Sequence, residues 1–314
     1  MYRHILAGVL LVVANCIYAQ CNCSSASSPV SFAETGNASI TLNKNQWVIE
    51  TYADYRSFNR QRVNHNKHYH STTENSSPES ESKSVLIASG VLRYGLTNRI
   101  TLSVQQPVQW LNSTIGNING SGDLLFTATI KLFDKNYFAA AFVTDIELPT
   151  GTRSISDGKV NMSAGSGSYD PLGAIAIEQS WNNFFIRTNF LYKYSTVGFE
   201  KINVGSFMSH NITVGYRLKT AQTICTTDTI NVPNKKISWS VFSGIPGEWT
   251  AHGVKENVTI INTGAYTLFL QAGSMVGFGK WSFSGSFGFP LIQKLTGEQN
   301  AMHYRTRIGI IKTF

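Results

Sequence analysis

The stretch "FFIRTNFLYKYS", residues 184–195, alternates large apolar and polar side chains over twelve positions. One face carries Phe184, Ile186, Phe190, Tyr192 and Tyr194 with one threonine, and the other carries Arg187, Asn189 and Lys193. A period of two indicates a β-strand with one apolar face. Because strands of a sandwich usually run five or six residues, whereas a tilted strand needs about 9–11 to cross a membrane, the length favours a membrane strand.

About twelve such stretches follow one another, which predicts an all-β fold. They are residues 45–58, 83–94, 99–110, 122–133, 137–148, 169–180, 184–195, 206–218, 236–246, 262–276, 280–290 and 302–314. Only 14% of the residues are charged, against roughly a quarter in soluble domains, and no stretch is long and apolar enough for a spanning helix. We predict an antiparallel transmembrane β-barrel over residues 45–314, with apolar side chains toward lipid and polar ones toward the lumen.

The connections alternate in length. Short links at 95–98, 134–136, 182–183 and 277–279 interleave with long polar ones at 59–82, 111–121, 149–168, 196–205, 247–261 and 291–301. Bacterial outer-membrane barrels place short turns on the periplasmic side and long loops outside. The exception is 219–235, a long link where a short turn is expected.

The two ends of the chain indicate export to the outer membrane. Residues 1–19 form a predicted secretory signal peptide with cleavage after Ala19; lipidation of Cys16 or Cys21 is the alternative. Residues 20–44 form a predicted periplasmic segment, and whether it enters the lumen stays open. A disulfide could join Cys225 to Cys21 or Cys23 on that side. The ending "MHYRTRIGIIKTF" resembles the signal that the outer-membrane assembly machinery recognises.

The polar faces predict the lining of the lumen. It comprises Glu50, Asp54, Arg56, Arg93, Asp123, Lys131, Asp145, Glu147, Asp170, Glu178, Arg187, Lys193, Arg217, Arg305 and Arg307. A tight turn at Asn182-Asn183 places Glu178 opposite Arg187. Barrel closure is expected to bring Glu50 and Asp54 near Arg305 and Arg307. These charges either brace the interior or line a permeation path, and the two roles are compatible.

One strand has a nearly bare inner face. In "KWSFSGSFGF", residues 280–289, Trp281, Phe283, Phe287 and Phe289 are predicted to face lipid. The alternate positions hold Ser282, Ser284, Ser286 and Gly288, which give the lumen wall almost no volume. We expect open space, or the N-terminal segment, against that wall.

Three stretches resemble a known family: "GSGDLLFTATIKLF" (120–133), "DIELPTG" (145–151) and "AGSGSYDP" (164–171). They are similar to the outer-membrane proteins of the phenol-degradation MetA-pathway family. The resemblance covers roughly residues 45–314. It implies a barrel of about this size that passes small molecules, aromatic or apolar ones among them, across the outer membrane.

Other kinds of chemistry have weak support. His65, His68 and His70 lie in a polar loop with no rigid element to fix a metal site, and no cofactor is expected. The net charge of +8 is scattered, so nucleic acid is not a predicted partner. As strand neighbours, Ser209 and His210 point to opposite faces and cannot form a nucleophile and base pair, so no enzyme is predicted.

The function predicted from sequence is that of a channel or transporter for small molecules in the cell outer membrane. Its partners are then the lipid bilayer, a small-molecule solute and the assembly machinery. The alternative is a non-conducting structural, adhesion or sensor barrel that acts through its extracellular loops.

Overall fold

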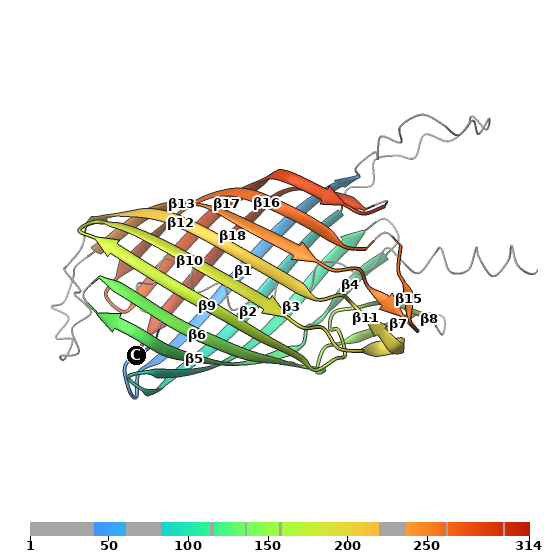
Figure 1. Cartoon of the computed structure of the whole chain (residues 1–314), viewed down its shortest axis with the longest axis horizontal. Helices are drawn as coiled ribbons and strands as arrows, with labels where there is room; N and C mark the ends of the chain where they lie inside the picture. The colour runs from blue at the N-terminus through green and yellow to red at the C-terminus, as the bar shows by residue number, and fades with distance from the viewer. Residues whose placement is uncertain are drawn as a thin grey trace, which may run out of the picture.

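Twelve long antiparallel strands close into a barrel in the computed structural model of the chain (Figure 1). The structure describes residues 41–60, 83–113, 116–135, 137–156, 159–219, 237–261, 263–297 and 299–314. The barrel strands are β1 (Trp47–Arg60), β2 (Lys83–Thr97), β3 (Ile100–Ser113), β5 (Leu124–Lys135), β6 (Phe138–Leu148), β9 (Asp170–Trp181), β10 (Phe184–Lys193), β12 (Phe207–Lys219), β13 (Ile237–Thr250), β16 (Ala265–Phe278), β17 (Trp281–Leu295) and β18 (Asn300–Thr313). All twelve predicted strands are confirmed.

The ring closes between the first and the last strand. Strand β1 pairs with β2 on one side and with β18 on the other, from Val48 opposite Thr313 to Arg60 opposite Asn300. Each of the other barrel strands pairs with the barrel strand before it and with the one after it, so no strand of the described barrel has an edge that is wholly unpaired. Closure removes the free edges that an open sheet would expose to lipid.

Two strands run past the proline at which we predicted them to end. Strand β13 continues four residues beyond Pro246, and β17 continues five beyond Pro290. Proline removes a ladder donor, so it is tolerated where the pairing is irregular. Pro246 lies between the pairs Gly244–Gln271 and Gly247–Leu268, and Pro290 lies beside a register shift between Leu268 and Phe269.

The long loops at one end of the barrel, on the right of Figure 1, contain short strands. They are β4 (Gly116–Ser121), β7 (Arg153–Ser156), β8 (Lys159–Ser163), β11 (Ile202–Asn203), β14 (Val254–Lys255) and β15 (Val258–Thr259), with a 3-10 turn, η2 (Phe199–Lys201). We call this the long-loop end. The opposite, short-turn end has tight turns in which Asn182 and Gly279 adopt positive φ, as their residue types allow.

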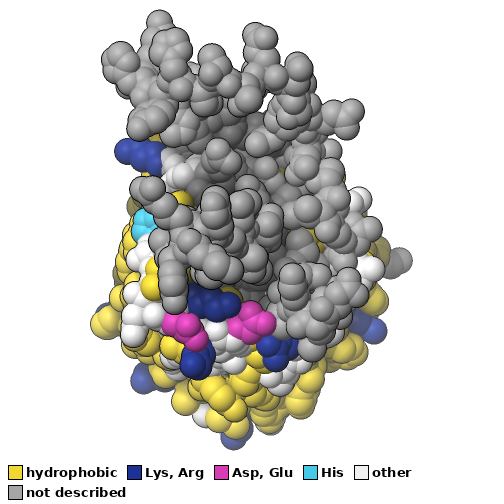
Figure 2. Space-filling model, turned by 90° about the vertical axis from the view of Figure 1, so that its right-hand side faces the viewer, with side chains coloured by type: hydrophobic (Ala, Val, Ile, Leu, Met, Phe, Trp, Pro, Cys, Tyr) yellow, Lys and Arg dark blue, Asp and Glu magenta, His cyan; other side chains and the backbone are white. Residues whose placement is uncertain are grey.

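The outer surface of the barrel is apolar. Phe126 is 43% exposed and Phe283 is 49% exposed, whereas the residues that alternate with them are half-buried or buried. Seen from the long-loop end, hydrophobic side chains cover most of the visible flank, and basic and acidic side chains meet nearer the centre (Figure 2). Among the described residues, no helix is long and apolar enough to cross a membrane.

The aromatic ribbon of β17 faces outward, as predicted. Trp281, Phe283, Phe287 and Phe289 are all at least 42% exposed. The bare inner wall is partly filled, however. A Cβ added to Gly288 would lie 3.4 Å from Cγ and Nε of Arg305, so the Arg305 side chain occupies the room that the glycine leaves. The expectation of open space is therefore wrong at Gly288.

The ladder between β17 and β18 is incomplete toward the long-loop end. It runs from Trp281 opposite Lys312 to Gly288 opposite Arg305 and includes no later pair. Beyond it, the side chain of Gln293 joins the two strands. Its Nε2 donates to the Met302 carbonyl over 2.8 Å, and the Met302 N–H donates to its Oε1 over 2.8 Å. One amide side chain thus takes the place of a backbone pair.

Residues 41–46 lead into the barrel at its short-turn end. The Leu42 N–H donates to Oγ1 of the buried Thr101, and the Asn45 N–H donates to the Gly95 carbonyl. The signal peptide at 1–19, residues 20–40, His65, His68, His70 and all the cysteines of the predicted disulfide lie outside the described residues. Those predictions stay predictions.

Candidate permeation path

Glu178 forms ion pairs with two arginines on the inner wall. Its carboxylate accepts from Arg187 on β10 and from Arg217 on β12, each over 2.8 Å. Arg187 is directly opposite Glu178 in the register, as the Asn182-Asn183 turn predicted. The Phe185 ring lies 4.4 Å from the guanidinium carbon of Arg187 and 4.8 Å from that of Arg217. Such stacking adds to the charge-assisted bonds.

Asp54 lies at the closure of the barrel between two arginines. It accepts from Nε of Arg56 over 2.7 Å and from Nη2 of Arg307 over 2.7 Å. The expected approach of β1 and β18 charges is thus found for Asp54 and Arg307. Glu50 instead pairs with Arg93 on β2, because Glu50 is opposite Ile311, several residues from Arg305 and Arg307. The expected approach of Glu50 to those arginines is wrong.

Arg305 extends along the wall to other strands. It donates from Nη2 to Gln271 on β16 over 2.7 Å and from Nη1 to Glu248 on β13 over 2.8 Å. Its guanidinium carbon lies 4.3 Å from the centre of the Phe269 ring. The sequence prediction missed Glu248 because it ended that strand at 246; period-two alternation continued past Pro246 would have included it.

A third group of charges lies near the long-loop end. Lys193 donates to Glu147 over 2.8 Å and lies 3.7 Å from Asp170. Asp123 accepts from the Gly151 N–H and the Ser166 hydroxyl, each over 2.8 Å. Side chains added at Gly151 or Gly165 would collide with Asp123, so these glycines let two loops close around its carboxylate.

Two predicted lining residues lie apart from these groups. Lys131 is half-exposed near the short-turn end and donates to Asp134 over 2.7 Å, beside a register shift between Lys131 and Phe133. Asp145 is buried, and its Oδ2 accepts from the Thr127 hydroxyl over 3.2 Å. The other predicted lining residues are buried or half-buried and belong to the groups described above.

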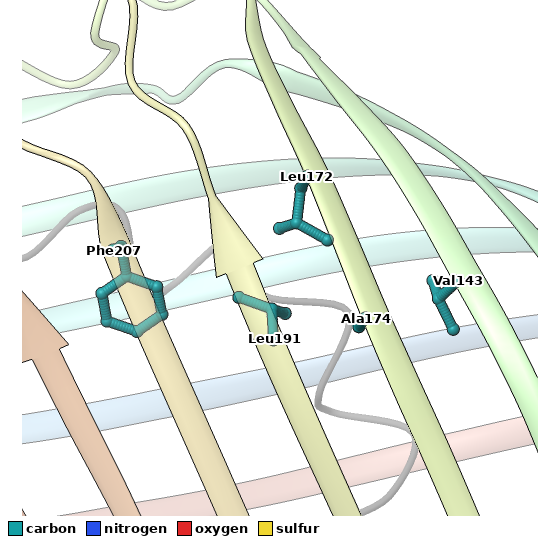
Figure 3. Close-up of a cluster of buried hydrophobic side chains, with 5 residues drawn as sticks. All are labelled: Val143, Leu172, Ala174, Leu191 and Phe207. Atoms are coloured by element: carbon teal, nitrogen blue, oxygen red, sulfur yellow. The ribbon is translucent and has the colours of Figure 1, made fainter.

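Apolar side chains occupy the inner wall between the charged groups. Five of them form one buried cluster across strands β6, β9, β10 and β12 (Figure 3): Val143, Leu172, Ala174, Leu191 and Phe207. Two more phenylalanines, Phe242 and Phe269, are also buried. The Phe242 ring lies against Gly273, where an added Cβ would collide with it. The wall is thus a mixture of neutralised charge and apolar surface.

The metal and nucleophile candidates raised by the sequence can be located only where the structure describes them. The described residues contain no group of three or more His, Cys, Asp or Glu side chains that could hold a metal ion. Ser209 is buried, whereas His210, its neighbour on β12, packs against Gly247. The two side chains leave opposite faces of the strand, as the alternation predicted.

The comparisons with known proteins agree with the barrel. The family model described as "Putative MetA-pathway of phenol degradation" matches residues 56–231, more than half of the 314 residues. The chain belongs to this family. The resemblance predicted from the three motifs is confirmed. No curated protein matches the sequence.

One solved outer-membrane channel shares the fold, and other solved barrels show a weaker similarity. An outer membrane channel from Pseudomonas putida F1 is similar with a TM-score of 0.65 and 14% identity, over 87% of this chain and 97% of that chain. The translocator domain of the autotransporter NalP from Neisseria meningitidis gives a TM-score of 0.47 and 9% identity, over 95% of this chain and 99% of that one. This chain therefore has the fold of an outer-membrane β-barrel, and its apolar outer surface has the composition that contact with lipid requires.

Proposed function

We propose that the protein is an outer-membrane channel for small molecules with apolar bodies, aromatic ones among them. The observation that carries this proposal is the composition of the inner wall. Buried Phe185, Phe207, Phe242 and Phe269 point to the same side as the polar residues, and Tyr52 is buried with them. An interior that served only to pass ions and water would gain nothing from this apolar area.

The pairing of the inward charges supports the same reading. Lys193, Arg187, Arg217, Arg305 and Arg307 each lie within 2.8 Å of a carboxylate oxygen. Paired charges give the lumen little net field, so the wall does not favour one sign of ion strongly. We propose that these lining residues brace the barrel and border the path at the same time.

The comparisons add support at the level of the fold. The similar barrel from Pseudomonas putida F1 is titled an outer membrane channel, and the family description names phenol degradation. A small aromatic solute fits both statements.

The direct test is transport by the purified full-length barrel. Single-channel current in planar bilayers and swelling of proteoliposomes in small uncharged solutes are measured together. We expect resolvable current and swelling that falls as the solute grows. Protein that is folded by its heat-dependent gel mobility, yet gives neither current nor swelling, would reject the channel.

One observation favours a second candidate, a barrel that acts through its loops. The long-loop end carries a small platform in which Glu200 lies 3.5 Å from Arg153 and 3.6 Å from Lys255, and Arg153 stacks on Phe199 at 4.8 Å. We infer that a charged platform carried by the loops presents a binding surface. The same current and swelling measurements separate the two candidates, because only the channel requires transport.

A further inference from the structure

A group of buried polar side chains on β10 and β12 lacks hydrogen bonds within the described chain. Nδ2 and Oδ1 of Asn189, Oδ1 of Asn211 and Oγ of Ser209 have no hydrogen-bond partner there. The three residues are 5%, 3% and 7% exposed, so bulk water does not replace those partners. Buried polar groups in native proteins are nearly always paired, and each exception calls for an explanation.

The unpartnered groups are neighbours in the barrel wall. Asn189 is directly opposite Asn211, and the next pair of inner residues is Leu191 opposite Ser209. Residues opposite each other on one face of an antiparallel pair have Cβ atoms about 5 Å apart. The two amides and the hydroxyl therefore present their hydrogen-bonding atoms from one small area of the inner wall.

Apolar surface adjoins this area on the same face. Leu191 belongs to the cluster with Val143, Ala174, Leu172 and Phe207 that Figure 3 shows. In the register, Ala174 is opposite Leu191 on one side and Val143 on the other. We call Asn189, Asn211, Ser209 and this cluster the inner-wall site.

We propose that the inner-wall site binds a neutral molecule with an apolar body and a hydroxyl group. This inference rests on the proposed channel function, since a ligand must enter the lumen to reach the wall. A hydroxyl both donates and accepts, and an asparagine amide does the same. The hydroxyl would bond the two amides while the body of the molecule packs beside the apolar cluster.

The charges around the site select against anions. Three cations face the carboxylates beside the site: Arg187 and Arg217 share Glu178, and Lys193 lies against Glu147 and Asp170, so each cation already has an acidic partner. Asp145, opposite Leu172, adds a buried carboxylate with one oxygen, Oδ1, that lacks a hydrogen bond. A carboxylate ligand would meet this acidic surplus with no cation to neutralise it.

The test is equilibrium binding to the full-length barrel in lipid nanodiscs, with empty nanodiscs as the blank. The probes are 4-ethylphenol, ethylbenzene, 4-ethylbenzoate and 4-ethylbenzylamine, which share a body and differ in the polar group. The variant is Asn189→Leu with Asn211→Leu, which keeps side-chain volume. The control is Thr129→Val, a buried inner-wall change on β5.

We expect the parent and Thr129→Val to bind 4-ethylphenol about tenfold more tightly than ethylbenzene, the effect of one or two neutral hydrogen bonds. In the double variant the preference should fall below about twofold, while the barrel unfolds at the same or a higher urea concentration, because two unpaired buried amides are gone. A structural role for the amides would instead lower the stability.

Several outcomes would overturn the site. They are an unchanged preference in the double variant, tighter binding of the benzoate or the benzylamine than of the phenol, and binding of no probe. Current and swelling of the parent protein are recorded in parallel. If the parent protein transports solutes but shows no preference for the hydroxyl, the inner-wall site is rejected and the channel function stands. If it binds the phenol preferentially but transports nothing, the channel function is rejected and the site stands.

Discussion

Arg305 on β18 binds Glu248 on β13, although β17 and β16 stand between them in the barrel. The Arg305 stem lies over Gly288 on β17, where an added Cβ would be 3.4 Å from its Cγ and Nε, so a side chain that extends beyond Cβ would press on the stem. A substitution at Gly288 would therefore disturb an ion pair that spans three strand–strand boundaries, β18–β17, β17–β16 and β16–β13.

The first prediction concerns that glycine. Gly288→Val should lower the free energy of unfolding by about 1–3 kcal/mol, since a branched side chain forces the Arg305 stem away from its packed position. Urea unfolding in lipid vesicles measures the effect. Gly285→Val is the matched control, because nothing lies within 4 Å of a Cβ added to Gly285. Equal stability of the two variants would show that Gly288 is not needed for the path of Arg305.

The second prediction concerns the shared carboxylate of Glu178. Glu178→Gln keeps the shape but removes the charge that Arg187 and Arg217 both contact. We expect a loss of about 3 kcal/mol in unfolding free energy, as for other broken buried ion pairs. Glu256→Gln is the control, since its pair with Lys201 spans 3.4 Å with side chains 62% and 78% exposed and should contribute nothing measurable. Similar urea midpoints for the two variants would contradict the bracing role.

The third prediction tests which face meets lipid. Phe283→Arg or Phe126→Arg places a charge in the apolar belt, at a cost of about 2–4 kcal/mol near the membrane midplane. The folded fraction after insertion into vesicles, read from heat-dependent gel mobility, should fall in both. Phe283→Leu should insert like the parent protein. Normal insertion of both arginine variants would mean that the strand faces are assigned in reverse.

The fourth prediction concerns the seam between β17 and β18. Gln293→Leu removes the two hydrogen bonds to Met302, each of which contributes about 1 kcal/mol. The Met302 amide should then exchange with deuterium faster, while the Ile310 amide, within the paired part of the seam, keeps its protection. If Met302 exchange is unaffected, Gln293 does not hold the seam.

The strands could be predicted from the sequence because each repeats a period of two over ten or more residues, and membrane strands need that length. The pair Glu178 and Arg187 followed from one tight turn, since a hairpin fixes register locally. The partners of Glu50 and Arg305 could not be predicted in the same way. They depend on the register at barrel closure and on a side chain that crosses neighbouring strands, and neither appears in local alternation.

The polar part of the inner-wall site could not be predicted from the sequence either. Asn189 appeared on the polar face of the opening stretch, but its lack of a hydrogen-bond partner becomes visible only when β10 and β12 are placed side by side. Glu248 was missed for a simpler reason, since the predicted strand ended at residue 246 and the observed strand continues to Thr250.

The channel function is tested most directly by placing a large side chain in the lumen beside β17, whose inward-facing residues are small. Ser286 faces inward, where its hydroxyl accepts from Gln271 over 3.1 Å, whereas the adjacent Gly285 lies on the outward face in open space. Single-channel conductance of Ser286→Trp is compared with that of Gly285→Trp, both folded by heat-dependent gel mobility. We predict that Ser286→Trp loses most of the conductance and that Gly285→Trp keeps it. Equal conductance in the two variants, or none in the parent protein, would contradict a path along this wall.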